Sequence, residues 1–179
     1  ARRRRNDGSS RFSPDNKWGL FPSAAFAWKI INEPFMAGAE NVMSDLKLRL
    51  GYGVTGQQNL GSGDYPWMGR YSYSQAGANY FFGDQMVPLI RPLAYDQNLK
   101  WEETATYNAG LDYGFLNNRI NGAVDVYYRK TTDLLNTVGI AAGTNFSNQL
   151  LTNVGELENK GIEFTITGRP IVSRDWNWN

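Results

Sequence analysis

The feature that most constrains this sequence is a pair of long runs of alternating apolar and polar residues within residues 104–130. In the first run, Leu111 belongs to the apolar parity and Asp112 belongs to the polar parity. Successive side chains of a β-strand point to opposite faces, so each run presents one apolar face and one polar face. A short break separates the runs and contains Asn117-Asn118, and Asn tolerates the left-handed backbone angles of tight turns. The pattern predicts a β-hairpin.

The two arms of this hairpin are long. Each arm alternates for about 11 residues, roughly the length with which a tilted strand crosses a bilayer, whereas ordinary strands have about 5 or 6. Aromatic residues lie near the ends of the apolar face, as they do in the interface girdles of membrane barrels. A transmembrane hairpin and a long hairpin of a soluble β-sandwich both fit this segment. The aromatic residues are Tyr107, Tyr113, Phe115 and Tyr128.

Residues 46–55 alternate almost perfectly and favour the barrel. Leu48 and Leu50 share the apolar parity, while Lys47 and Arg49 share the other. Charged side chains on an inward face need water or carboxylate partners, which a polar lumen supplies and a sandwich core does not. We therefore expect Leu46, Leu48, Leu50, Leu111, Tyr113, Val124, Val126, Ile162 and Phe164 to face lipid, and Lys47, Arg49, Asn108, Asp112, Asp125 and Glu163 to face the lumen.

Further alternating segments are predicted at residues 21–30 and 161–168, and residues 176–179 begin another. This segmentation gives roughly six strands, fewer than the 8 of the smallest complete barrels. The connections alternate between short and long, and membrane barrels place long loops on one side and short turns on the other. A structureless loop as long as the first one would be unusual inside a compact soluble domain. We expect residues 56–100 and 131–153 to be extracellular loops, and residues 32–45 (with a helical turn from Pro34), 116–118 and 169–175 to be short periplasmic turns.

The composition excludes several kinds of site. The sequence has no cysteine and no histidine, which excludes disulfides, thiolate or imidazole metal ligands and a Ser-His triad within this segment. A formal net charge of +1 provides no basic field for nucleic acid. Glu102 and Glu103 are adjacent, so on a strand they point to opposite sides and cannot act together as a glycosidase pair. We expect no enzymatic activity, no metal site and no cofactor.

The hydropathy and the N-terminal charges bear on the membrane. No run of about 18 apolar residues is present, so we expect no transmembrane helix. A mean hydropathy of −0.49 agrees with a barrel, because a barrel strand gives only every second residue to lipid. The basic run Arg2–Arg5 is interpreted as a solvated flank or strand end, and alternatively as a contact with anionic lipid headgroups. Residues 6–17 are dense in turn-forming residues and predict a loop.

Four stretches of the chain carry a family resemblance: DGSSRFSPDNKWGLFPS, DLKLRLGYGVTGQQN, LKWEETATYNAGLDYGFLNNRINGAVDVYYRKTTDLL and NVGELENKGIEFTI. Together they are similar to the SusC/RagA-like TonB-dependent outer-membrane transporters of Bacteroidetes-type bacteria. The likeness covers most of the chain and keeps the order of the motifs. The departure is the N-terminal ARRRR, where family members usually show an alternating strand.

The resemblance implies an all-β fold, an antiparallel transmembrane β-barrel segment that is part of a large, 22-stranded barrel closed by an N-terminal plug. Residues 1–179 would be part of the receptor's β-barrel domain, with the plug and the TonB-contact segment outside this chain. The implied function is TonB-dependent import of oligosaccharides or peptides across the bacterial outer membrane, with a SusD-like surface lipoprotein as a lid. The implied partners are outer-membrane lipids, that lipoprotein, TonB through the missing N-terminal part, and the oligosaccharide or peptide substrate.

The first long loop is the only plausible recognition element in the sequence. Its aromatic residues lie among Gly, Ser and Gln, and aromatic faces bind sugar rings or peptide side chains through their apolar surfaces. Alternatively, these residues pack the loop against itself or against a lid protein. Two other functions stay open, a passive porin or adhesin barrel and a secreted sugar-binding β-sandwich. The candidate contact residues are Tyr65, Trp67, Tyr71, Tyr73, Tyr80, Phe81 and Phe82.

Overall fold

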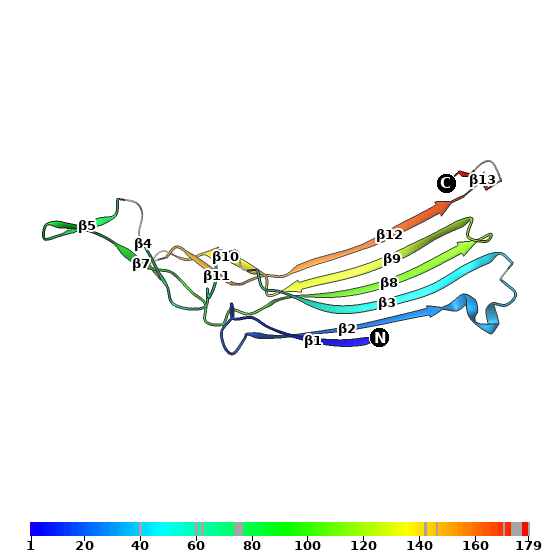
Figure 1. Ribbon diagram of the computed structural model, residues 1–179, viewed down its shortest axis with the longest axis horizontal. Helices are drawn as coiled ribbons and strands as arrows, with labels where there is room; N and C mark the ends of the chain where they lie inside the picture. The colour runs from blue at the N-terminus through cyan, green and yellow to red at the C-terminus, as the bar shows by residue number, and fades with distance from the viewer. Residues whose placement is uncertain are drawn as a thin grey trace.

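The computed structural model describes residues 1–39, 41–59, 61, 63–73, 77–141, 143–145, 147–169, 171–172 and 177–178, the last two pairs by their backbone alone. Its largest element is an antiparallel sheet of six strands in the order β1-β2-β3-β8-β9-β12 (Figure 1). The strands are β1 (Arg2–Gly8), β2 (Trp18–Lys29), β3 (Met43–Gln57), β8 (Glu102–Phe115), β9 (Ile120–Thr132) and β12 (Leu157–Gly168).

Smaller elements lie in the connections between these strands. Two 3-10 turns follow β2, and four short two-stranded sheets lie outside the large sheet among the described residues. Within the described residues, no helix is long and apolar enough to cross a membrane. The turns are η1 (Ile30–Asn32) and η2 (Pro34–Met36), and the small sheets pair β4 (Tyr71–Tyr73) with β7 (Ile90–Pro92), β5 (Asn79–Phe82) with β6 (Gln85–Pro88), β10 (Leu135–Gly139) with β11 (Gln149–Asn153), and β13 (Ile171–Val172) with β14 (Asn177–Trp178).

The strand register joins the alternating residues into rows that run across the sheet. Leu48 of β3 pairs with Leu111 of β8, which pairs with Val124 of β9 and then with Phe164 of β12. Residues that pair across neighbouring strands share a face. The neighbouring row through Arg49 therefore lies on the opposite face. All the residues that we expected to face lipid lie on one face, and all those that we expected to face the lumen lie on the other.

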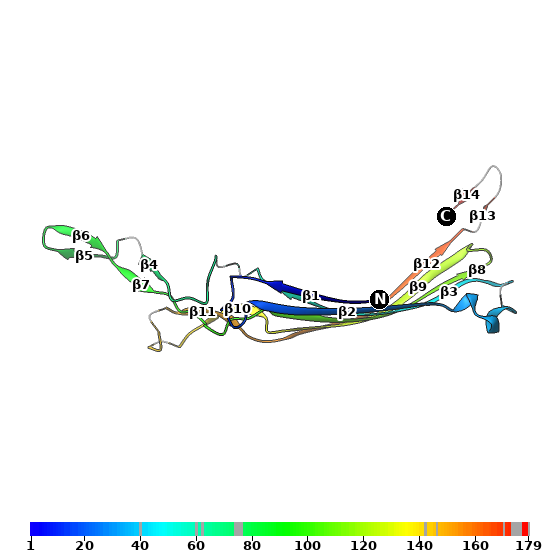
Figure 2. The same cartoon turned by 60° about the horizontal axis from the view of Figure 1, so that its bottom comes forward.

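The sheet is a single curved layer, with the long loops extending from one end (Figure 2). No second sheet covers its apolar face among the described residues, and Ile162 on that face is 74% exposed. The sandwich interpretation is therefore wrong, because a sandwich would bury this face against another layer. The sheet is also not closed: β1 and β12 are its two edges.

The short connections lie at the end of the sheet opposite to the long loops (Figure 1). Between β8 and β9, residues 116–119 make a turn in which Leu116, Asn117 and Asn118 all have positive φ angles, of 53°, 57° and 60°. The two asparagines tolerate this conformation, whereas it costs energy at Leu116. Pro34 begins η2, as the sequence predicted.

The structure differs from the sequence prediction at both ends of the chain. The sixth strand of the sheet is β1 and not the C-terminal run, because the described part of that run, residues 177–178, pairs with β13. The rest of the predicted run, residues 176 and 179, lies outside the described residues, as do residues 170 and 173–175 of the last predicted turn. The predicted loop at residues 6–17 is shorter, since β1 continues to Gly8.

The long connections contain strands of their own. The first contains the β4–β7 pair and the β5–β6 hairpin, and we call the described residues of 71–92 the arm (Figures 1 and 2). The second, at residues 131–153, contains the separate β10–β11 hairpin.

Candidate functional site

The most buried hydrophobic residues of the described chain form a cluster at the loop end of the sheet. Phe12 is 1% exposed and Leu99 is fully buried, and Phe21 and Trp101 complete the cluster, which we call the loop anchor. The Trp101 ring lies 5.0 Å from the Phe12 ring and 5.3 Å from the Phe21 ring, measured between centroids. The anchor thus joins the turn after β1, strand β2 and the end of the first long loop.

Two glycines make room for the anchor. A Cβ atom at Gly19 or at Gly56 would collide with the Phe21 ring. The ring therefore occupies space that any other residue at these two positions would fill. Backbone that lies directly against an aromatic ring in this way fixes the position of the ring.

Hydrogen bonds connect the two long loops near the anchor. The Nδ2 amide of Asn153 donates to the carbonyl oxygens of Lys100 (2.9 Å) and Asp133 (2.8 Å), and its Oδ1 accepts from the Lys100 backbone N–H (2.9 Å). The Lys100 ammonium also lies 2.9 Å from Asp133 Oδ2. We call these contacts the loop clasp. Because the Asn153 side chain forms hydrogen bonds with the backbone of both loops, it holds the bases of the two loops at a fixed separation.

The aromatic residues predicted as contacts occupy three different places. Trp67 is at the base of the first loop, where it packs against the loop anchor and its Nε1–H donates to Ser10 O at 3.3 Å. This packing agrees with the loop-packing alternative for Trp67, and ligand contact by this residue stays a prediction. Tyr65 precedes it with a positive φ of 56°. The other five lie in the arm: Tyr71 and Tyr73 in β4, and Tyr80, Phe81 and Phe82 in β5.

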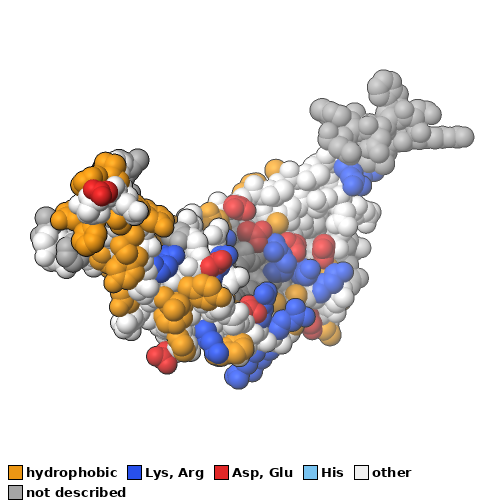
Figure 3. Space-filling model, turned by 60° about the vertical axis from the view of Figure 1, so that its left-hand side comes forward, with side chains coloured by type: hydrophobic (Ala, Val, Ile, Leu, Met, Phe, Trp, Pro, Cys, Tyr) orange, Lys and Arg blue, Asp and Glu red, His pale blue; other side chains and the backbone are white. Residues whose placement is uncertain are grey.

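The arm exposes apolar side chains on both of its faces. Tyr80, Phe81 and Phe82 follow one another in a strand, so they alternate in direction, and Phe82 is 73% exposed. Met86 on the paired strand β6 is also exposed. Figure 3 shows hydrophobic side chains gathered over the projecting loops. A surface of this kind is typical of a contact site for a ligand or a protein partner.

The polar face of the sheet carries a charge cluster centred on Arg49. The guanidinium binds Asp112 through two nitrogens, with Nε 2.9 Å from Oδ2 and Nη2 2.8 Å from Oδ1. Its Nη2 also donates to Asp125 Oδ2 at 3.0 Å, across the intervening strand β8. Gly110 lies between them in the register and leaves the space for this contact. These are the carboxylate partners that we expected a polar face to supply.

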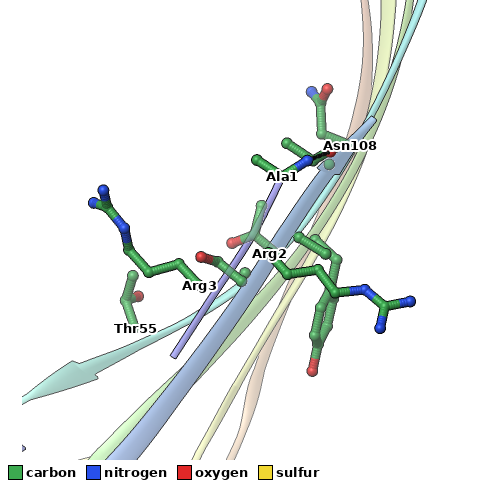
Figure 4. Close-up of a pocket in the computed structure, with 12 residues that line it drawn as sticks. Ala1, Arg2, Arg3, Thr55 and Asn108 are labelled. Carbon is green, nitrogen blue, oxygen red and sulfur yellow. Dashed lines mark hydrogen bonds between the residues drawn. The ribbon is translucent and has the colours of Figure 1, made fainter. Parts of the chain in front are cut away.

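A hollow of about 580 Å³ lies beside strands β1, β2 and β3. Figure 4 shows Arg3, Thr55 and Asn108 on one side of these strands and Arg2 on the other. The register agrees, since Arg2 pairs with Ala24 of the apolar face and Arg3 pairs with Ser23 of the polar face. The basic run is thus a strand with two faces, and contact of Arg2–Arg5 with lipid headgroups stays a prediction.

The described residues contain no group of three or more Asp or Glu side chains that could hold a metal ion. Glu102 begins β8 and its Oε2 accepts from the backbone N–H of Leu135 at 3.1 Å, while Glu103 faces the other side of the strand. Glu156 and Glu158 bind Lys130, at 2.9 and 3.5 Å. Glu102, Glu156 and Glu158 therefore have structural partners.

Comparison with known sequences identifies relatives along the whole chain. Residues 2–179 match the family model described as TonB dependent receptor-like, beta-barrel. The chain is 56% identical over 173 residues to the TonB-dependent receptor SusC of Bacteroides thetaiotaomicron, covering 97% of this chain and 17% of SusC. It is 38% identical over 177 residues to the TonB-dependent receptor P3 of Formosa agariphila, covering 98% of this chain and 17% of that protein. The chain thus spans less than a fifth of the length of these relatives.

Solved structures agree with the sequence relatives. The chain superposes on the RagAB peptide importer in the closed-closed state with a TM-score of 0.81 at 31% identity, covering 98% of this chain and 18% of that one. The open-open state of the same importer gives a TM-score of 0.80 at 32% identity, with the same coverage. An open antiparallel sheet with one apolar and one polar face is what a segment of a barrel wall requires. The chain belongs to the TonB-dependent receptor family of the bacterial outer membrane, and it forms part of the SusC/RagA-like β-barrel domain.

Proposed function

We propose that the protein containing this chain imports oligosaccharides or peptides across the outer membrane in a TonB-dependent reaction. The observation that carries this proposal is the 56% identity to SusC along nearly the whole chain, together with the fit to the RagAB peptide importer. In this proposal the chain contributes wall and loops, and the plug and the TonB contact come from the rest of the protein.

The two faces of the sheet have different environments in this proposal. The apolar face, with Leu48, Leu111 and Val124, contacts lipid, and its exposed side chains pack against the acyl chains. The polar face, with the Arg49 cluster, lines the lumen, where water and neighbouring carboxylates solvate the charges. The long loops are extracellular and the turn at residues 116–119 is periplasmic, because long loops lie on the outer side of such barrels.

The arm is the contact for a surface lipoprotein that acts as a lid. Exposed Tyr80, Phe81 and Phe82 on a projecting hairpin are suited to the apolar centre of a protein interface, where aromatic residues are enriched. A substrate contact at Tyr71 or Tyr73, nearer to the base of the arm, is compatible with this role.

The test uses the complete receptor in its own bacterium. Uptake of a fluorescent oligosaccharide mixture and of a fluorescent peptide mixture is measured with and without TonB. Active import predicts that uptake of one mixture saturates and disappears without TonB, whereas a passive porin would continue to admit the substrate. Uptake that is unchanged without TonB would contradict the proposal.

The lid contact is tested separately by purification of the receptor with its membrane partners. Replacing Tyr80 and Phe82 with Ser should reduce the co-purified lipoprotein by at least about tenfold, since truncation of central aromatic residues often costs more than 2 kcal/mol. Phe35, which is also exposed but lies at the opposite end of the sheet, is the matched control. Equal losses from Phe35→Ser and from the arm variant would contradict the assignment.

A further inference from the structure

A second hollow lies between the base of the arm and the tip of the β10–β11 hairpin. Its volume is about 470 Å³, within the range of roughly 300–1,000 Å³ that is common for small-molecule sites. None of the seven aromatic residues singled out in the sequence lines it. The lining residues are Pro92, Leu93, Tyr95, Gly143, Thr144 and Asn145.

The two walls of this hollow are held together at their base. Asp96, directly after Tyr95, has its Oδ2 atom 2.5 Å from the hydroxyl of Thr152 in β11. The loop clasp at Asn153 adds further hydrogen bonds between the same two segments. A ligand in the hollow would therefore meet walls that are already positioned, which lowers the ordering cost of binding.

Tyr95 provides an aromatic surface in the hollow. Its side chain is 43% exposed, and a Cβ atom at Gly69 would lie 3.3 Å from its Cε1 atom. The glycine backbone thus supports the ring closely without covering it. An exposed, supported aromatic ring is suited to stacking against the C–H face of a sugar ring.

The polar groups of the hollow are uncharged. Asn145 uses its Oδ1 to accept from the Ser147 backbone N–H at 3.1 Å, and its Nδ2 amide has no hydrogen-bond partner among the described residues. Thr144 donates its hydroxyl hydrogen to Ala141 O at 2.6 Å, which leaves the oxygen lone pairs as acceptors. The hollow thus offers an amide donor and a hydroxyl acceptor beside an aromatic ring.

We propose that this hollow is a subsite for a neutral sugar ring of the imported substrate. A sugar presents an apolar C–H face to Tyr95 and hydroxyl groups to Asn145 and Thr144. The charged terminus of a peptide or the carboxylate of an acidic sugar would meet no opposite charge among the lining residues, so its desolvation would be uncompensated. The inference rests on the proposed import function and names neutral oligosaccharides as the substrate class.

The experiment measures binding to the full-length receptor in detergent by calorimetry. The probes are neutral hexasaccharides of glucose, xylose and mannose, with a neutral hexapeptide for comparison. Tyr95→Ala should weaken binding of the preferred hexasaccharide by about tenfold, and Asn145→Ala by about fivefold. Tyr95→Phe keeps the ring and should bind within about twofold of the natural protein, which separates loss of stacking from loss of folding.

Phe35→Ala is the matched control, because Phe35 is an exposed aromatic residue that does not line the hollow and lies at the opposite end of the sheet. Equal weakening by Phe35→Ala and Tyr95→Ala would overturn the assignment of the hollow. Binding of the hexapeptide with no binding of any hexasaccharide would overturn the sugar class. Uptake measured in parallel with and without TonB reports on the import function itself, so the two proposals fail independently.

Discussion

Arg49 of β3 and Asp125 of β9 form an ion pair of 3.0 Å across the strand that separates them. The residue between them in the register is Gly110, which has no side chain to block the guanidinium. The contact therefore joins three strands of the wall on the polar face.

Gly110→Ala should break this contact. The added Cβ would collide with Asp125 and would lie 2.7 Å from Arg49 Nη2, so both side chains must move. We expect the free energy of unfolding of the full-length receptor to fall by about 1–2 kcal/mol, a modest loss because both groups are partly solvated. Gly51→Ala is the control, since its nearest neighbour would be Asn108 Cβ at 3.8 Å. Urea titrations of the two variants check the difference, and equal losses would contradict it.

Gly56→Ala should loosen the loop anchor. The new methyl group would occupy the place of the buried Phe21 ring, and overpacking of this kind costs about 1–3 kcal/mol. The expected result is faster hydrogen exchange at residues 99–101, measured by mass spectrometry on the complete receptor. Gly53→Ala, whose Cβ would meet Ser23 Cβ at an ordinary 3.7 Å, should leave exchange there unchanged. Unchanged exchange in both variants would show that the anchor does not depend on this glycine.

Val124→Arg tests which face contacts lipid. An arginine on the lipid face near the middle of the bilayer should lower the free energy of unfolding by about 2–4 kcal/mol. Ala123→Arg is the neighbouring control on the polar face, where it lies opposite Asp112 and should cost far less. Unfolding titrations in lipid vesicles give both values. A larger loss from Ala123→Arg would reverse the assignment of the two faces.

Short epitope tags test the sidedness of the connections. A tag between Gly83 and Asp84, in the turn of the arm, should bind antibody on intact cells. A tag at Asn117 should bind only after the outer membrane is made permeable. Antibody binding to the Asn117 tag on intact cells would overturn the topology.

The sequence predicted the strands and their two faces because burial and solvation impose a period of two on the residues. The alternation predicts one face for Leu48, Leu111 and Val124, and the strand register confirms that they form one row. Strand β1 was harder to identify because Arg2–Arg5 has no alternation, so nothing in the residue types separates its two faces. Its pairing with β2 determines which side chains of β1 lie on the apolar face and which lie on the polar face.

The contacts between distant segments could not be predicted in the same way. Trp67 was grouped with the recognition residues, but its place at the loop base depends on packing against residues far away in sequence. Tyr95 and Asn145, which we propose as subsite residues, are 50 positions apart in the sequence, and only the folding of two loops brings them to one hollow. An exposed aromatic residue beside a closely packed glycine, as at Gly69, is a signal that only coordinates can provide.

The pairing of β4 with β7 has a consequence for how such receptors diversify. Tyr71 and Pro92, at the two ends of the arm, are register partners, so the chain leaves and re-enters the loop base at neighbouring points, about 5 Å apart. The segment between them can be exchanged as a cassette, whatever its length, without moving the two attachment points. Grafting residues 71–92 from one receptor to another should therefore transfer the properties of the arm onto an unaltered wall.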